Sequence, residues 1–223
     1  MTDYIRYELS DSIATLNMDD GKANAYGPDM IAALASGLDR AADEAKAVII
    51  SGRPGVLCAG FDLRIIRGGD PDAAAAMRSA GKALLLKAYL HPQPIVFACT
   101  GHALAAGALL LLTGDYRIGA QGDFKIGLNE TGIGLSLPPF GIELARDRLV
   151  PQALSRATIT AEVYDPEGAL AVGYLDALST AQALAEAAHA AAARLAELDR
   201  DALTKTKQRL RQATVDRILA AGD

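Results

Sequence analysis

The chain has 223 residues, a length that fits one domain with a sizeable buried core. Its formal net charge of −5 argues against a nucleic-acid-binding protein, which would need a basic face. Hydrophobic residues make up 51% of the chain, but the longest apolar run, residues 103–112, is too short to span a bilayer and is expected to be a buried helix.

The first fifty residues predict a hairpin, a loop and a helix. Residues 4–9 and 13–18 look like two strands, joined by the turn sequence Ser-Asp-Ser. Residues 19–27 are polar and contain glycine, which indicates a loop. Pro28 suits the first turn of a helix that we expect to run to about Glu44.

The middle of the chain alternates strands with helices. Residues 47–51 and 94–100 are short, continuously apolar segments, which are typical of strands in a sheet covered on both faces. A glycine turn and a helix over about 72–90 separate them. A second small-residue turn and its helix follow, and then two short strands near 116–119 and 124–126.

Helices dominate from Pro139 onward. Residues 180–196 are alanine-rich and amphipathic, and residues 203–219 carry a basic face. The order of elements predicts an α/β domain with a helical C-terminal part.

Two turns carry most of the chemical information. Each lies in a run of glycine and small residues, at 56–63 and 101–112, that follows a predicted buried strand and leads into a helix. Small residues let a ligand approach the backbone, and a helix start adds the positive end of its dipole. Two such turns that converge would form an oxyanion hole for a carbonyl oxygen.

These segments resemble the crotonase (enoyl-CoA hydratase/isomerase) superfamily. The matching motifs are GKANAYGPDM, LCAGFDL, HPQPIVFACTGHALAAGALLLLTGDYRI, IGLNETGIGL, PEGALAVGYLDAL and KTKQRLRQAT, in the order the family has them. The resemblance implies a spiral of ββα units over residues 1–160, a helical trimerisation region over 161–223, and an acyl-CoA thioester substrate. The chain is somewhat short for the family after the first turn and at its C-terminal end.

The resemblance also implies the site residues. The two oxyanion-hole N–H groups fall on Phe61 and Ala106. The two glutamates that hydratases use fall on Leu109 and Leu128, which are apolar here. Glu130, in IGLNE, matches the catalytic glutamate of mitochondrial-type Δ3,Δ2-enoyl-CoA isomerases.

One carboxylate suffices for an isomerase. It takes a proton from C2, the oxyanion hole holds the dienolate, and the acid returns the proton at C4. An apolar pocket would raise the pKa of Glu130 toward neutrality, and Leu109, Leu128, Ile133 and Leu135 could supply its wall. We therefore expect an enoyl-CoA isomerase of fatty acid β-oxidation. An enoyl-CoA hydratase or a catalytically idle acyl-CoA-binding paralogue remain the alternatives.

The substrate contacts that the resemblance implies lie in the loop after the second strand, in the two turns and in the pocket wall. They are Lys22, Ala23, Asn24, Ala59, Gly60, Asp62, Leu63, Gly107, Leu109, Leu128 and Ile133. Asp62 is also expected to cap the helix that follows it. Lys205 or Lys207 would hold part of the CoA phosphates.

No cofactor is expected, because coenzyme A enters as part of the substrate, and no metal is expected, because no Cys/His cluster has ligand spacing. The two cysteines are too few for a disulfide framework, and no apolar leader is visible near the start. We expect a cytoplasmic homotrimer or dimer of trimers, with no membrane or nucleic-acid partner.

Overall fold

A computed structural model describes residues 4–222, whose strands form two sheets. The larger has the order β1-β2-β3-β5-β7-β9, in which β1 and β2 are antiparallel and all other neighbours are parallel. Its strands are β1 (Ile5–Ser10), β2 (Ile13–Met18), β3 (Ala47–Ser51), β5 (Ile95–Cys99), β7 (Tyr116–Ala120) and β9 (Ala177–Ser179). The smaller is parallel and contains β4 (Gly55–Cys58), β6 (Gly101–Leu104) and β8 (Ile126–Gly127).

Helices follow these strands and make up most of the C-terminal part. They are α1 (Pro28–Glu44), α2 (Leu63–Ile66), α3 (Pro71–Tyr89), α4 (Ala106–Leu112), η1 (Thr131–Ile133), α5 (Pro139–Arg148), η2 (Pro151–Ala153), α6 (Leu154–Thr158), α7 (Pro166–Val172), α8 (Leu184–Ala196) and α9 (Arg200–Ala220). In residues 4–222 no helix combines the length and apolar character that a bilayer crossing requires.

The chain winds as a spiral. It passes from a strand of the large sheet to a strand of the small sheet and then to helix, and it does so three times. The turns are β3–β4 with α2 and α3, β5–β6 with α4, and β7–β8 with η1 and α5. The expected crotonase-like spiral of ββα units is confirmed.

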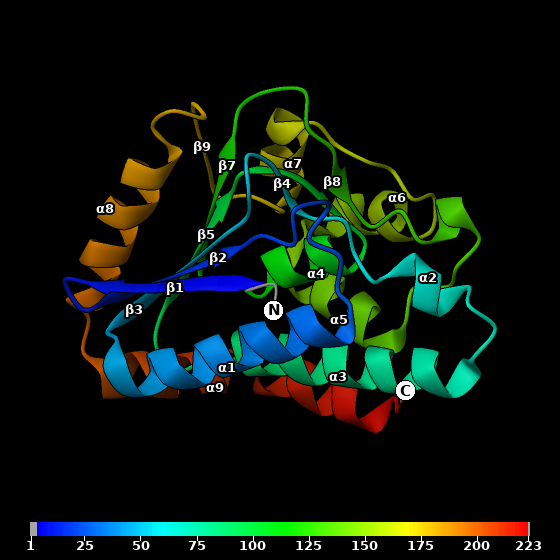
Figure 1. Cartoon of the computed structure of the whole chain (residues 1–223), viewed down its shortest axis with the longest axis horizontal. Coiled ribbons are helices and arrows are strands. Elements are labelled where there is room, and N and C mark those ends of the chain that lie inside the picture. Colours follow the sequence, from blue (N-terminus) through cyan, green and yellow to red (C-terminus); the bar gives the residue numbers. More distant parts are fainter. Residues whose placement is uncertain (1–3, 223) are drawn as a thin grey trace.

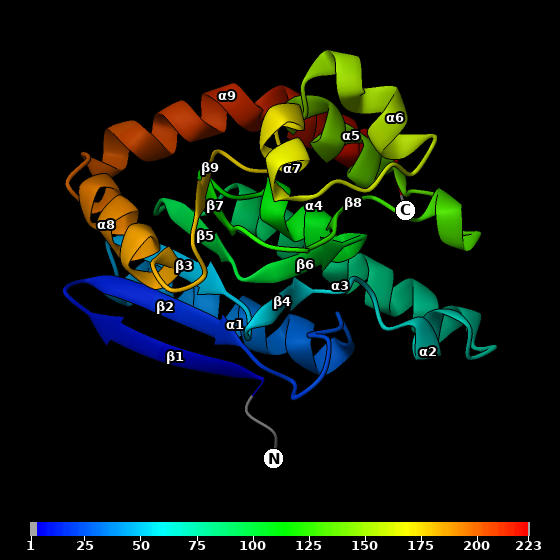
Figure 2. The same cartoon turned by 90° about the horizontal axis from the view of Figure 1, so that it is seen from above.

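The central strands β3, β5 and β7 are buried on both faces, which explains why they are almost continuously apolar. Ile49, Val96 and Ile118 point to α8, whose alanines let the helix pack closely on the strands. Their neighbours Ile50 and Phe97 point into the main core. In Figure 1, α8 lies to the left of the sheet, and α1, α3 and α9 lie below the strands. Figure 2 shows that α3 lies between α1 and α9.

The predicted elements differ from the observed ones mainly at the second turn. The helix expected over 103–112 begins only at Ala106, because residues 101–104 form β6. This strand pairs with β4 and β8, which are distant in sequence, so no local pattern announces it. The short β9 was also not expected, whereas α1 has the bounds that the sequence predicts.

Candidate active site

Three loops meet at one edge of the small sheet. Because β4, β6 and β8 are parallel, their carboxyl ends lie at the same edge, in register through Cys58–Ala103 and Leu104–Gly127. The residues that follow these strands are 59–61, 105–106 and 128–130. The two small-residue turns and the candidate carboxylate Glu130 are therefore neighbours in space.

The first two turns touch each other at Gly60. Its φ of +96° is a conformation that glycine adopts freely. A Cβ on Gly60 would lie 2.8 Å from the Cβ of Ala105 and 3.4 Å from the amide nitrogen of Ala106. Glycine is thus required here for the close approach of the two turns.

Phe61 is held in place by its ring and by its neighbours in the chain. A Cβ on Gly81 of α3 would lie 2.5 Å from the ring, so the ring packs directly on that glycine. Gly60 accepts a hydrogen bond from the Tyr26 amide at 2.8 Å, and the Asp62 amide donates to Tyr26 at 3.2 Å. In this parallel bridge the amide of Phe61 itself points away from Tyr26.

The second turn presents the start of a buried helix. Ala105 precedes α4 with φ of +51°, an uncommon conformation for a residue with a Cβ, and its amide donates to Gly127 at 3.0 Å. Ala106 is the first residue of α4, and N–H groups in a first turn have no acceptor within the helix. Ala106 is 1% exposed and does not itself line the cleft described next, but its amide directly follows Ala105, which does.

A cleft of about 570 Å³ lies against both turns. Its walls come from the turns, from α2 and α3, from α4, and from the segment between β8 and α5. The residues that line it are Ala59, Phe61, Leu63, Ile66, Arg78, Leu104, Ala105, Leu109, Asn129, Glu130, Ile133, Leu135, Ser136, Leu137, Pro138 and Pro139. Most of these side chains are apolar, as is typical of sites that bind small molecules.

Glu130 is the one carboxylate among the described residues that line this cleft, and it is buried. The residue is 8% exposed. Its Oε2 atom has no hydrogen-bond partner within residues 4–222. Its backbone carbonyl accepts from Ile133 and Leu135, at 3.0 and 2.9 Å, which fixes the turn that carries it. Burial raises the pKa of Glu130 to about 7, and a hydrogen bond from its own backbone offsets only part of that rise.

The loop predicted to contact CoA lies beside the first turn rather than in the cleft. The Ala59 amide donates to the carbonyl of Ala23 at 3.0 Å, which joins the loop to the turn. Lys22 and Ala23 are exposed. The buried Asn24 side chain donates to Met18 and Leu57, at 2.9 and 3.1 Å, and so holds the loop to the core.

Four other predicted contact residues do not line the cleft. Gly107 packs on β4, because a Cβ there would lie 2.2 Å from the Cys58 carbonyl oxygen. Leu128 is buried in the core, and Gly60 forms the contact between the turns. Asp62 caps α2 as expected, accepting from the Arg64 amide at 2.9 Å, and its ion pair with the Arg64 side chain holds its pKa below the usual range.

Lys207 is a correction. From the sequence, Lys205 or Lys207 is expected to hold part of the CoA phosphates, but the side chain of Lys207 is buried and its ammonium lies 2.6 Å from a carboxylate oxygen of Asp115. It also donates to the carbonyls of His91 and Gln93. Lys205 is exposed and pairs with Asp201 at 2.5 Å.

Several cleft residues escaped the sequence reasoning. Arg78 on α3 stands exposed at the cleft, and Asn129 contributes a buried amide oxygen that has no partner within residues 4–222. Leu137, Pro138 and Pro139 complete the wall at the start of α5. The position of Asn129 directly before Glu130 was a usable signal, whereas the position of Arg78 on α3 was not.

Comparison with known proteins is consistent with this geometry. The sequence model of a family described as enoyl-CoA hydratase/isomerase matches residues 8–222. A solved enoyl-CoA hydratase/isomerase family protein from Pseudomonas syringae is 45% identical, with a TM-score of 0.96 over 98% of this chain and 95% of that one.

Curated relatives carry both activities in their names. The human mitochondrial enoyl-CoA delta isomerase 1 is 28% identical over 215 residues, which are 95% of this chain and 71% of that protein. A probable enoyl-CoA hydratase of Mycobacterium avium is 35% identical over 170 residues, 74% of this chain and 64% of that protein.

Proposed function

The chain belongs to the enoyl-CoA hydratase/isomerase family, the crotonase superfamily, and we propose that it is a Δ3,Δ2-enoyl-CoA isomerase with Glu130 as its single acid and base. One observation carries this proposal. Of the described residues that line the cleft, Glu130 alone has a carboxylate, and it is buried with an unpaired oxygen.

The proposed reaction moves one proton across one face of the substrate. The C2 proton of a 3-enoyl thioester is acidified by the thioester and by the adjacent alkene. Glu130 takes this proton, and the electron pair spreads through a dienolate to the thioester oxygen. The N–H groups of Phe61 and Ala106 stabilise that oxygen. The protonated Glu130 then returns the proton to C4, and the double bond ends between C2 and C3.

The environment of Glu130 supports both halves of this cycle. A carboxyl group with a pKa of about 7 is a base strong enough to accept the C2 proton and an acid strong enough to release it near neutral pH. Leu109, Ile133 and Leu135 line the same cleft and keep it apolar. Solvent exchange with the transferred proton should be limited there.

The hydratase alternative lacks a second carboxylate. Leu109 and Leu128 occupy the positions that the two hydratase glutamates would have, and each is 1% exposed. Leu109 lines the cleft beside Glu130, so an apolar side chain is present where a second glutamate would hold the attacking water. The name of the mycobacterial relative keeps hydration as the second candidate.

The decisive test offers the wild-type protein 3-enoyl-CoA and 2-enoyl-CoA in parallel. Isomerisation of the first with slow hydration of the second supports the proposal. A second experiment uses 3-enoyl-CoA deuterated at C2. If one base shielded from solvent carries the proton, part of the deuterium should appear at C4 of the product. Efficient hydration would favour the hydratase, and tight binding without turnover of either thioester would favour the idle paralogue.

We also propose that the helical region 161–223 forms an assembly surface for a trimer or a dimer of trimers. Leu198, Leu210 and Leu219 are 51%, 72% and 61% exposed, although they lie beside buried faces of α8 and α9. Burial of such leucines against another copy is favourable. Light scattering tests this, and a stable monomer of about the chain mass overturns it. We also propose a cytoplasmic location for this protein.

A further inference from the structure

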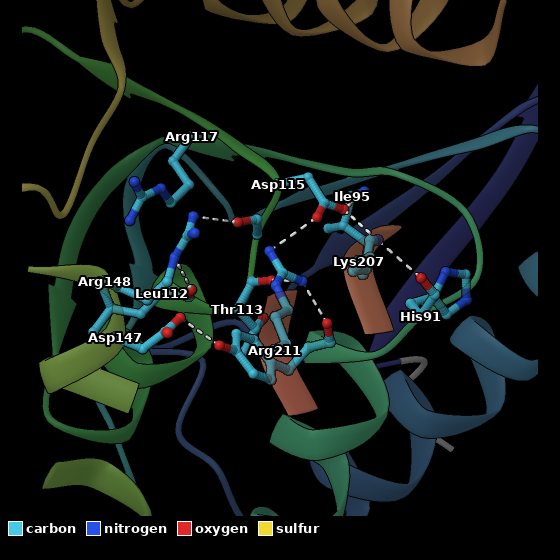
Figure 3. A network of polar contacts seen from close by, with 12 residues as sticks. His91, Ile95, Leu112, Thr113, Asp115, Arg117, Asp147, Arg148, Lys207 and Arg211 are labelled. Carbon is cyan, nitrogen blue, oxygen red and sulfur yellow. Dashed lines mark hydrogen bonds and ion pairs between the residues drawn. The ribbon is translucent and has the colours of Figure 1, made fainter. Parts of the chain in front are cut away.

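A cluster of charged residues, some buried and some partly exposed, surrounds the far end of α4, the helix that begins at the proposed oxyanion hole. Figure 3 shows side chains from α5 and α9 converging there with Asp115 and Arg117. Asp115 accepts from Lys207 at 2.6 Å, from Arg211 at 2.9 Å and from the Ile95 amide at 2.8 Å. These contacts tie α9 to the core.

Arg148 differs from the other cations of this cluster. Its Nε donates to the carbonyl of Leu112 at 3.1 Å, and its Nη2 donates to the carbonyl of Gly114 at 2.9 Å. Arg117, Lys207 and Arg211 each pair with a carboxylate. Within residues 4–222 Arg148 has no carboxylate at ion-pair distance, and its described polar partners are these two carbonyls.

This arrangement joins the far ends of two helices that both begin at the cleft. Pro138 and Pro139 line the cleft at the start of α5, and Arg148 is the last residue of that helix. Ala106 is the first residue of α4, and Leu112 is its last. Gly141 allows the two helices to meet near the cleft, because a Cβ there would lie 3.1 Å from the Cδ1 of Leu109.

We propose that Arg148 is a positioning residue for the oxyanion hole. Its guanidinium fixes the carbonyl end of α4 against α5, and thereby holds the Ala106 N–H at the cleft. Its positive charge also offsets the negative end of the helix dipole, which leaves the N-terminal end more favourable for an oxyanion. This inference rests on the proposed function, since it assigns Arg148 a part in stabilising the dienolate.

The surroundings of Arg148 disfavour its positive charge. Burial lowers its pKa, and the neighbouring cations Arg117 and Arg211 lower it further. A neutral donor could bond the same two carbonyls without the cost of a buried charge. A charged group bound to the end of this helix is therefore expected to do more than pack.

The size of the effect follows from the length of the helix. Seven helical residues span roughly 10 Å, and at that separation a unit charge in a medium of effective dielectric constant about 20 changes an equilibrium by up to about tenfold. We therefore expect Arg148→Met to lower kcat for 3-enoyl-CoA by roughly three- to tenfold, with KM changed by less than about twofold.

A second readout reports the oxyanion hole without the isomerase reaction. Acetoacetyl-CoA, a 3-oxoacyl thioester, forms an enolate whose ultraviolet absorbance follows its ionisation when bound. Arg148→Met should raise the apparent pKa of the bound probe by about 0.5–1 unit, the same three- to tenfold change. Glu130→Gln should remove isomerisation but leave the oxyanion hole able to stabilise the enolate.

Controls separate positioning from loss of stability. Arg117→Met also removes a buried guanidinium, one that bonds Asp176 and the Gly173 carbonyl, and should lower the melting temperature without an equal shift of the enolate. Arg148→Lys keeps the charge and should recover most of the enolate stabilisation. Arg148→Gln is neutral but keeps an N–H donor. If Arg148→Met does not fold, kcat and the pKa of the bound probe are measured in Arg148→Gln instead.

The outcomes decide the proposal in either direction. A folded neutral variant with wild-type kcat and wild-type enolate pKa overturns it, as does an equal shift in Arg117→Met. A wild-type protein that does not enolise the bound probe also overturns it, because there is then no oxyanion hole to position. If the wild type enolises the probe but does not isomerise 3-enoyl-CoA, the proposed function is wrong. The pKa of the bound probe in the Arg148 variants then still decides whether Arg148 positions the oxyanion hole.

Discussion

The carboxylates of Glu130, which is buried, and of Asp115, which is partly buried, have opposite surroundings. Asp115 lies at the far end of α4 and accepts from two cations and a backbone amide. Glu130 lies at the cleft, and burial without a cation raises its pKa to about 7. The comparison teaches that burial alone does not assign a role. A carboxylate whose charge is fully paired holds the structure, whereas an unpaired one is poised to exchange a proton.

The largest expected effect is on catalysis. Glu130→Gln keeps the shape of the side chain but cannot accept the C2 proton. We expect isomerisation of 3-enoyl-CoA to fall by about 10²–10⁴-fold, the usual range for losing a positioned base. Steady-state assays measure the loss, and calorimetry should find acyl-CoA binding little changed. Wild-type turnover in this variant would place the base elsewhere.

The matching change at Asp115 should affect stability. Asp115→Asn leaves Lys207 and Arg211 buried beside a neutral amide, and breaking a buried pair typically costs about 3–5 kcal/mol. Urea unfolding measures the free energy. The exposed pair of Lys205 and Asp201 is the control, since Asp201→Asn should cost less than about 1 kcal/mol. Equal losses in both variants would contradict the structural role of Asp115.

The oxyanion hole can be tested by removing one donor. Proline is tolerated at the first position of a helix, so Ala106→Pro removes the N–H where α4 begins. Isomerisation should fall by about 10²–10³-fold. Ala106→Gly keeps the N–H and is the matched variant, and circular-dichroism melting checks both folds. A folded proline variant with near-normal turnover would remove Ala106 from the site.

The smallest expected effect is on the free energy of unfolding, which should depend on pH because the ionised Glu130 carboxylate is buried without a cation. The pKa of about 7 in the folded protein lies above the ordinary glutamate pKa of 4.5, so the folded state favours the protonated acid. The stabilising contribution is present below about pH 4.5 and is lost as pH rises through about 7. Glu130→Gln should therefore be more stable than wild type at pH 8, by about 2–3 kcal/mol.

The same titration predicts the opposite trend for activity. Glu130 must be ionised to accept a proton, so kcat/KM should fall as pH drops below about 7. Denaturant unfolding and rate measurements over pH 5–9 compare the two profiles. If wild type and Glu130→Gln have the same pH dependence of stability, the carboxyl group is not the source of the effect.

The sequence predicted the parts of the site that lie within short, continuous motifs. The two turns and Glu130 follow strands, and the parallel order of those strands brings them together. Helix α1 begins at Pro28 and ends at Glu44 as expected, because its start signal is local. The order of elements predicted an α/β domain, and the resemblance to the family implied that it is a spiral of ββα units.

Tertiary structure decided the features that depend on distant partners. Strand β6 exists because β4 and β8 flank it, and Lys207 is buried because Asp115 and two backbone carbonyls surround its ammonium. Arg148 bonds the end of α4 across 34–36 residues of chain. Local patterns fix turns, helix starts and apolar strands, since those depend on neighbouring residues. The partner of a charged side chain depends on which segments the fold brings beside it.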